Sequence, residues 1–396
     1  MRRWQETIAL GWQSGSDPRA PVLAQVAVAD RWATLEPAAA LPLAWRARAR
    51  GEMARFLAYR EMDPADWATR AKADASEALH RDPNEVEAWV AQASVLRTEG
   101  FQLLDQGKDP APRLQEALAM ADQGLRLDPG HVVLLNIRNS ALLPWIDAAR
   151  MRGTYDRAAA EPYLREARAL AASHPEEAYY QSNLGGLAQA MAKAELASGG
   201  DPSADAEEAV HAYEAGLRTQ PGHAGFHRGI LIALDVLARA MVQAGKDPAV
   251  IVERARGAFQ RARDAQAPLA TLAPYFMDVL VSAASQASTQ GQDPGAYLKE
   301  AGRLPFSDGR STEYPVEFGA IRLRYLALLL RSGPPAQSLR LREAGEAIAS
   351  SLLRRKPVDP GFWMTLAGFK AACGDLVAAG QARARCRALN PRWRGY

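Results

Sequence analysis

Residues 86–130 of the 396-residue chain read VEAWVAQASVLRTEGFQLLDQGKDPAPRLQEALAMADQGLRLDPG. Between Val86 and Leu104 the large apolar residues fall three, four or seven positions apart, which is the spacing of one buried helix face. The same spacing returns between Leu114 and Leu125. The stretch therefore predicts two amphipathic helices with a turn at Asp109-Pro110 between them.

The residues at the turns predict where these helices begin and end. The Asp109 carboxylate can accept a hydrogen bond from the first turn of the second helix, and Pro110 lacks an N–H group that would be unpaired there. Pro129 cannot continue the second helix, and Gly130 gives the backbone freedom to turn. We expect residues 86–130 to form one helix pair.

The turn signals recur with a period of 46 residues. Asp-Pro pairs end at Pro18, Pro64, Pro110, Pro202, Pro248 and Pro294, and Asp156 stands where one pair is missing. A second series comprises Pro37, Pro83, Pro129, Pro175 and Pro221, with Pro268 one residue late. No stretch combines alternation of period two with β-branched residues, so no sheet is predicted. A fixed period of this length indicates an array of repeated helix pairs.

Residues 360–393 resemble a tetratricopeptide repeat, a helix pair of 34 residues. The resemblance is carried by Trp363, Leu366, Ala367, Ala379 and Pro391, with Gly374-Asp375 in the interhelical turn, whereas Arg383 and Cys386 depart from the pattern. The other repeats look like the same pattern with twelve more residues, which lengthens each helix by roughly 9 Å. They are therefore tetratricopeptide-like.

The resemblance implies an all-α fold, a right-handed superhelical α-solenoid of about nine antiparallel helix pairs. We expect residues 1–303 to form 46-residue repeats with a partial first one. Residues 304–314 are expected to form an irregular loop that breaks the phase, and residues 315–396 the last helix pairs, ending in the 34-residue repeat. The partial first repeat suggests that sequence is missing upstream, and Gly333-Pro334-Pro335 replaces a usual Asp-Pro turn.

Composition excludes several classes of protein. Hydrophobic residues make up 48% of the chain and charged residues 23%, which is typical of a globular protein. Its apolar runs are too short to cross a bilayer, and no secretory signal follows Met1. We therefore expect no membrane insertion and favour a cytoplasmic location. Residues 322–396 carry fourteen Lys and Arg against four Asp and Glu, which makes the C-terminal end a basic pole.

No catalytic motif is complete, and we expect no enzyme activity, no catalytic residues, no cofactor and no metal. His80-Arg81-Asp82 resembles a kinase triplet but lacks the Asn five positions later. His223 and His227 have helical spacing without the Glu of a zinc motif. The two cysteines, Cys373 and Cys386, are predicted to lie too far apart for a disulfide.

In the family that the sequence resembles, the first helices of the repeats line a concave groove. By position, the groove candidates are Glu87, Arg97, Asn136, Ser140, Ser182, Gln189, Arg228 and Asp235. The Lys and Asn pair with which some members bind a peptide carboxylate is absent. The leading hypothesis is a non-catalytic scaffold that binds a protein or an extended peptide.

Two alternatives stay open. Long arrays of this kind resemble the C-terminal regions of some bacterial serine/threonine kinases, so the chain could be the regulatory or sensor segment of such an enzyme. The basic pole could instead contact nucleic acid. We favour a protein partner over nucleic acid.

Overall fold

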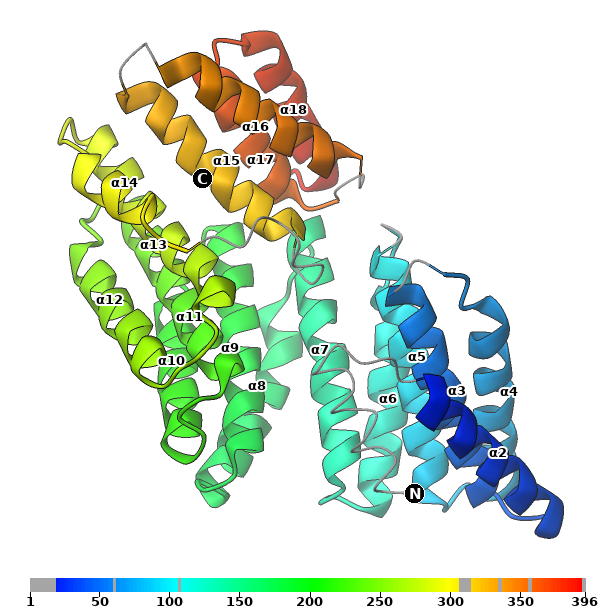
Figure 1. Cartoon of the computed structure of the whole chain (residues 1–396). Helices are drawn as coiled ribbons and strands as arrows, with labels where there is room; N and C mark the ends of the chain where they lie inside the picture. Colours follow the sequence, from blue (N-terminus) through cyan, green and yellow to red (C-terminus); the bar gives the residue numbers. More distant parts are fainter. Residues whose placement is uncertain are drawn as a thin grey trace. The chain divides into compact units, whose positions relative to one another are not determined.

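The structure is a computed structural model that describes residues 19–59, 62–105, 108–305, 315–333, 337–354 and 358–393. Seventeen α-helices, α2 to α18, form this described part, which contains no strand (Figure 1). None of the described helices is long and apolar enough to cross a bilayer. Some of the predictions concern residues outside this described part, namely Pro18, residues 306–314 and Pro334-Pro335.

The helices alternate between a first (A) and a second (B) helix of each repeat. The A helices are α3 (Leu41–Tyr59), α5 (Val86–Asp105), α7 (Val132–Arg152), α9 (Ala178–Ser198), α11 (Ala224–Gln243), α13 (Leu269–Thr289), α15 (Pro315–Ser332) and α17 (Pro360–Ala372). The B helices are α2 (Arg19–Leu35), α4 (Ala65–Arg81), α6 (Ala111–Leu127), α8 (Arg157–Ser173), α10 (Ser203–Thr219), α12 (Ala249–Asp264), α14 (Gly295–Ala301), α16 (Ser338–Leu353) and α18 (Leu376–Leu389). From α2 to α14, each B helix begins 46 residues after the previous one.

The predicted caps of the B helices are present. The Asp109 carboxylate accepts a hydrogen bond from the backbone N–H of Ala111 at 2.9 Å. Asp156, where the Asp-Pro pair is missing, makes the same bond to Ala158 at 2.9 Å. The equivalent bonds in the other repeats come from Asp63, Asp201, Asp247 and Asp293. Each of these helices therefore begins next to its own capping aspartate.

The turns before and after a B helix differ in the backbone conformation of their glycines. Gly130 does not adopt a positive φ, and helix α6 ends through the N–H of Asp128, which donates to the Gly124 carbonyl. Positive φ angles occur instead between the A and B helices, at Gly153, Gly199, Gly245 and Gly291, spaced 46 residues apart. Only glycine adopts this conformation without strain.

Helix α14 is much shorter than the other B helices. It contains 7 residues, whereas α12 contains 16. Helix α15 nevertheless begins at Pro315, which is 46 residues after Leu269 at the start of α13. The irregular sequence after residue 303 therefore shortens a B helix without moving the next A helix out of register.

The chain divides into two compact modules, residues 1–148 and residues 149–396, with the boundary inside α7. We call them the N-terminal and C-terminal modules. Small side chains dominate one core cluster of the N-terminal module: Ala44, Ala47, Ala75, Ala78, Ala88 and Ala91 are fully buried. Such residues let helices approach closely. The division into residues 1–303, 304–314 and 315–396 stays a prediction.

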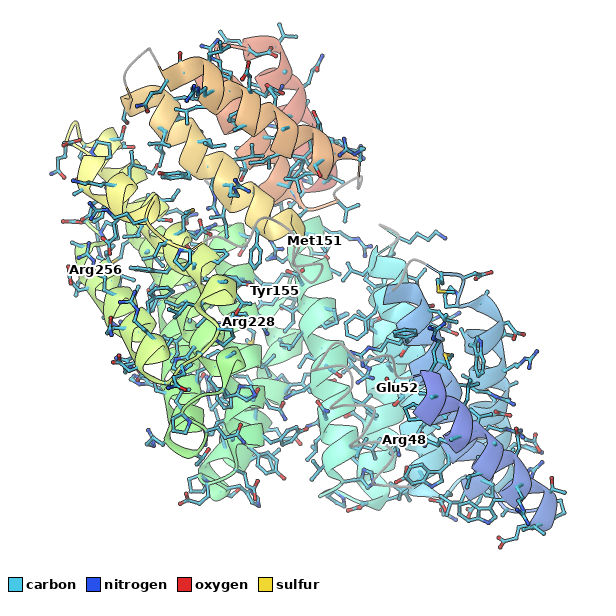
Figure 2. All side chains as sticks on the ribbon, in the orientation of Figure 1. Arg48, Glu52, Met151, Tyr155, Arg228 and Arg256 are labelled. Carbon is cyan, nitrogen blue, oxygen red and sulfur yellow. The ribbon has the colours of Figure 1, made fainter. Side chains whose placement is uncertain are left out.

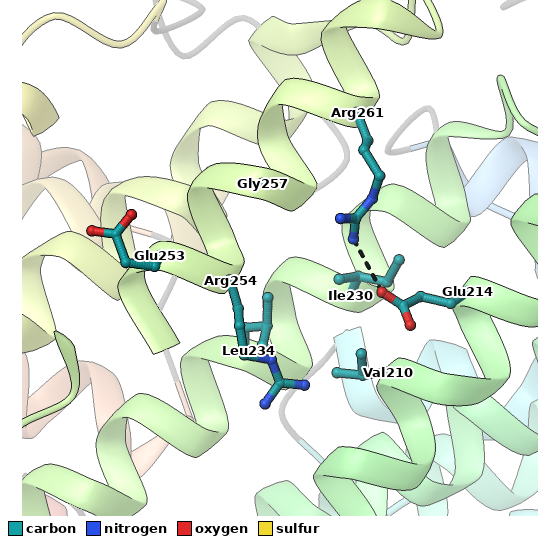
Figure 3. A pocket seen from close by; sticks show the side chains of 8 residues that line it. All are labelled: Val210, Glu214, Ile230, Leu234, Glu253, Arg254, Gly257 and Arg261. Atoms are coloured by element: carbon teal, nitrogen blue, oxygen red, sulfur yellow. Dashed lines mark hydrogen bonds and ion pairs between the residues drawn. The ribbon is translucent and has the colours of Figure 1, made fainter. Parts of the chain in front are cut away.

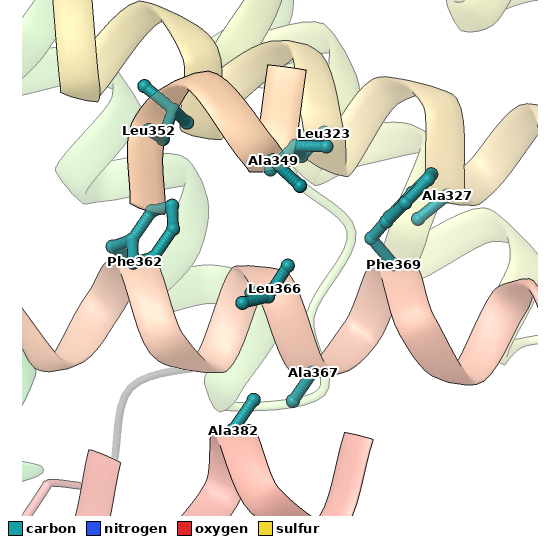
Figure 4. Close-up of a cluster of buried hydrophobic side chains, with 9 residues drawn as sticks. All are labelled: Leu323, Ala327, Ala349, Leu352, Phe362, Leu366, Ala367, Phe369 and Ala382. Carbon is teal, nitrogen blue, oxygen red and sulfur yellow. The ribbon is translucent and has the colours of Figure 1, made fainter. Parts of the chain in front are cut away.

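The core of the last two repeats is built from larger side chains (Figure 4). Phe362, Leu366 and Phe369 of α17 pack against Leu323 of α15 and Leu352 of α16. Phe369 is 0% exposed, and burying a side chain of this size contributes roughly 2 kcal/mol. The predicted family residue Trp363 packs at the edge of this cluster.

The last repeat also contacts the beginning of the C-terminal module. Asn390 Nδ2 donates a hydrogen bond to the Arg150 carbonyl at 2.9 Å, and a Cβ added to Gly153 would collide with Asn390 Oδ1. The Arg150 guanidinium lies 3.4 Å from the Asp359 carboxylate and 5.4 Å from the centre of the Trp393 ring. We call these five residues the C-terminal clasp. It joins segments about 240 residues apart within the C-terminal module.

Candidate binding surface on the A helices

Neighbouring A helices pack side by side: α3 against α5 in the N-terminal module, and α9, α11, α13, α15 and α17 in succession in the C-terminal module. Because the repeat is 46 residues long, a residue and its equivalent 46 positions later occupy corresponding places on adjacent helices. Asp278 of α13 and Arg324 of α15 form such a pair, with 2.5 Å between Oδ2 and a guanidinium nitrogen. We call this side of the repeats the A-helix surface.

In the N-terminal module, Glu87 is held by two basic side chains. Its carboxylate lies 2.5 Å from an Arg48 guanidinium nitrogen and 3.9 Å from His131 Nε2. Arg48 lies on α3, one helical turn before Glu52 (Figure 2). Burial lowers the pKa of Arg48, and Glu87 opposes that shift. The predicted groove residue Glu87 therefore links α3 and α5.

Two other predicted residues, Arg97 and Ser140, contact each other. A terminal nitrogen of Arg97 on α5 donates to Ser140 Oγ on α7 at 2.9 Å, and Ser140 Oγ donates to the Ile137 carbonyl. The Nε of Arg97 is buried and has no hydrogen-bond partner. Burial lowers the pKa of Arg97 to about 10, with a further contribution from Arg55. Burial of this Nε is therefore unfavourable, because no hydrogen bond offsets the loss of water.

In the C-terminal module, four charged side chains form a network over α11, α13 and α15. Arg239 binds both Asp235 (2.8 Å) and Asp278, and Arg324 binds Asp278 from the other side. Asp235 and Asp278 are buried, with exposed fractions of 9% and 6%. Burial raises the pKa of Asp235 to about 6, and the charge of Asp278 adds to the rise, while Arg239 opposes it. The network links three successive repeats.

The remaining predicted residues lie apart from this network. Asn136 is exposed, and Ser182 is half-buried. Gln189 Oε1 accepts a hydrogen bond from the Tyr213 hydroxyl at 3.4 Å. Arg228 is half-buried on α11 (Figure 2). The structure thus joins Arg97 to Ser140 and gives Asp235 partners that the sequence analysis did not name.

Sequence reasoning missed Arg48, Arg239, Asp278 and Arg324. Asp278 and Arg324 had a usable signal, because opposite charges stand one repeat length apart at equivalent positions. Arg239 and Asp278 are 39 residues apart, which is seven short of the period, and no regular spacing would have paired them.

A separate hollow of about 360 Å³ lies among α10, α11 and α12 (Figure 3). Val210, Ile230 and Leu234 contribute its apolar side chains, and Gly257 leaves space above them. Its charged rim is already paired, since Arg261 binds Glu214 at 3.0 Å and Arg254 binds Glu207 at 2.6 Å. The hollow contains no polar group that lacks a partner among the described residues.

The side chains that imitate reactive motifs have structural partners. His227 Nε2 lies 2.8 Å from the Pro221 carbonyl, and burial lowers the pKa of this imidazole. Both cysteines are free, and burial raises the pKa of the Cys386 thiol to about 11, so it is protonated at neutral pH. No group of three or more His, Cys, Asp or Glu in the described part of the chain could hold a metal ion.

The described helices define a class of protein: an all-α solenoid of tetratricopeptide-like helix pairs. No protein-family model matches the sequence. No curated protein matches it either.

Several solved structures match the chain at low sequence identity. The human IFIT1 dimer with PPP-AAAA is 14% identical over 98% of this chain and 82% of IFIT1, with a TM-score of 0.39. A monomeric IFIT1 mutant with Gppp-AAAA is also 14% identical over 98% of this chain and 80% of that one, with a TM-score of 0.40. Naa15/Naa10 bound to HypK-THB is 15% identical over 98% of this chain and 64% of that one, with a TM-score of 0.23. These values assign neither a family nor a ligand.

Proposed function

We propose that the chain is a non-catalytic scaffold that binds a protein or an extended peptide along its A-helix surface. The observation that carries the proposal is that, within each module, neighbouring A helices present polar side chains at one equivalent position. Arg48, Ser94 and Ser140 occupy equivalent positions of the N-terminal module, and Asp278 and Arg324 occupy the same position in the C-terminal module. Asp278 is itself buried, whereas the half-buried Ser94, Ser140 and Arg324 offer modest contacts to an extended ligand.

The interhelical bonds support this proposal because they fix the surface before a ligand arrives. The network of Asp235, Arg239, Asp278 and Arg324 holds three A helices in one arrangement. A ligand that meets side chains already held in place loses less conformational entropy on binding. The predicted residues Ser182, Gln189 and Arg228 add half-buried polar groups on α9 and α11.

The test is selection of peptides from a random library on the immobilised protein, followed by fluorescence anisotropy with the selected peptide. Arg228→Glu is expected to weaken binding at least tenfold, because it reverses a charge on the A-helix surface. Arg165→Glu, an exposed position on α8, is the matched control and should change affinity less than twofold. Equal effects of the two variants would show that the binding surface is misplaced.

The regulatory segment of a larger kinase is a second, compatible role, in which this surface would receive a segment of the same enzyme. Its test is the reading frame upstream of Met1, where a catalytic domain is expected. The third hypothesis, nucleic acid on the basic pole, predicts salt-dependent retention of the protein on DNA or RNA.

A further inference from the structure

Arg97 differs from the other well-buried arginines of the N-terminal module in having no acidic partner. Arg48 binds Glu87, and Arg46 and Arg50 both bind Asp74. Arg97 instead donates one N–H to the neutral hydroxyl of Ser140. Among the described residues, no carboxylate lies within 4 Å of its guanidinium, and its Nε is buried without an acceptor.

The neighbouring charges do not compensate for this. Arg48 and Arg55 both act on Arg97 as positive charges, and only Glu52 acts in the opposite direction. A guanidinium has five N–H donors and keeps its charge at neutral pH. A buried charge of this kind is unfavourable unless an anion pairs with it.

The surroundings of Arg97 leave an approach for such an anion. Arg97 keeps part of its surface exposed. Besides the charged side chains of α3, its polar neighbours are Ser94, one turn before it on α5, and Ser140, which it contacts on α7. Asn136, one turn before Ser140, is exposed. Serine and asparagine can add neutral hydrogen-bond donors without competing for the positive charge.

We propose that Arg97 anchors a carboxylate-binding site, formed with Ser94, Asn136 and Ser140, which takes an acidic side chain of the bound peptide. This inference rests on the proposed function and assigns the chemistry of one of its subsites. The planar guanidinium matches a carboxylate through two parallel N–H···O bonds. The bound anion would then replace the acidic partner that Arg97 lacks.

The first test is fluorescence anisotropy with a labelled peptide of ten glutamates. Arg97→Gln is expected to raise its Kd at least tenfold. The matched control is Arg126→Gln, which removes the same charge from an exposed position on α6 and should stay within twofold. Equal losses in the two variants would overturn the site, because net charge alone would then explain binding.

Two further measurements separate a binding role from a structural one. Arg97→Gln should keep or raise the thermal midpoint, since it removes a buried charge without an acidic partner. A lowered midpoint with unchanged peptide affinity would make Arg97 a structural residue and overturn the proposal. If inorganic tripolyphosphate binds through Arg97 and the glutamate peptide does not, the assignment of a carboxylate ligand is overturned.

Failure of this site is distinguishable from failure of the scaffold. If the glutamate peptide does not bind the native protein but a library-selected peptide does, with sensitivity to Arg228→Glu, the carboxylate site is refuted and the scaffold stands. If neither Arg97→Gln nor Arg228→Glu affects any selected peptide, both proposals are refuted.

Discussion

The substitution Asn390→Ala tests the C-terminal clasp. Asn390 is only 2% exposed, and its amide bonds the Arg150 carbonyl at 2.9 Å and the Arg392 N–H at 2.8 Å. Arg392 itself is exposed, so its N–H can find water after the substitution. The Arg150 carbonyl would lose this donor and keep the backbone N–H of Gly153, which donates to it at 3.2 Å. The loss of one such hydrogen bond, with the acceptor still partnered, costs about 1 kcal/mol.

Hydrogen exchange can measure this loss locally. About 1 kcal/mol corresponds to a roughly fivefold increase in the opening equilibrium of the clasp. Because the clasp joins two distant segments, exchange should accelerate both in α17–α18 and at residues 150–160. Gln381→Ala, an exposed position on α18, is the control and should leave both regions within about 0.5 kcal/mol of the native protein.

Faster exchange in α18 alone would refute the reasoning. It would mean that Asn390 stabilises its own repeat and that the contact with Arg150 contributes nothing. An unchanged rate in both regions would refute the estimated magnitude as well.

Three other perturbations follow from the structure. Asp235→Asn should flatten the pH dependence of the free energy of unfolding between about pH 4 and 6. The pKa of Asp235 is about 6 in the folded protein and roughly 3.9 in the unfolded chain. The stabilisation from its protonated form is therefore full at low pH and is lost as the pH rises through 6. A pH profile identical to that of the native protein would contradict this. Gly245→Ala should lower the free energy of unfolding by about 1–2 kcal/mol, because φ is +70° there and no neighbouring atom would contact the added Cβ. Gly380→Ala inside α18 should raise it by about 0.5–1 kcal/mol. Equal denaturation midpoints for the two variants would exclude the backbone explanation. Asp109→Ala should cost about 1 kcal/mol by removing the cap of α6, with Asp128→Ala as the control outside the helix start.

Local signals predicted most of the fold. The Asp-Pro and proline series located the helix pairs, because a cap acts within two or three residues of its own position. Asp156 illustrates the limit of reading the motif literally: the proline is absent, and yet the carboxylate caps α8 in the same way. Gly130 lies in the predicted turn without a positive φ, and the positive φ angles of Gly153 and its equivalents stand in the turns between the A and B helices.

The candidate surface was less predictable because its bonds depend on packing between repeats. Arg97 and Ser140 were both named, but their contact requires the relative placement of α5 and α7. The spacing between Arg239 and Asp278 does not match the repeat period, so the sequence did not predict that they pair. The clasp had no local signal at all, since Asn390 and Arg150 meet only after five repeats have stacked.

The clasp also constrains how this chain can change in evolution. An open solenoid can gain or lose a whole repeat and keep every remaining interface, because each repeat contacts only its neighbours. Between Arg150 and Asn390 that freedom is absent: one helix pair more or fewer would carry the amide of Asn390 away from its carbonyl partner. Homologues that retain both residues should therefore retain the number of repeats between them, while insertions should gather at loop tips.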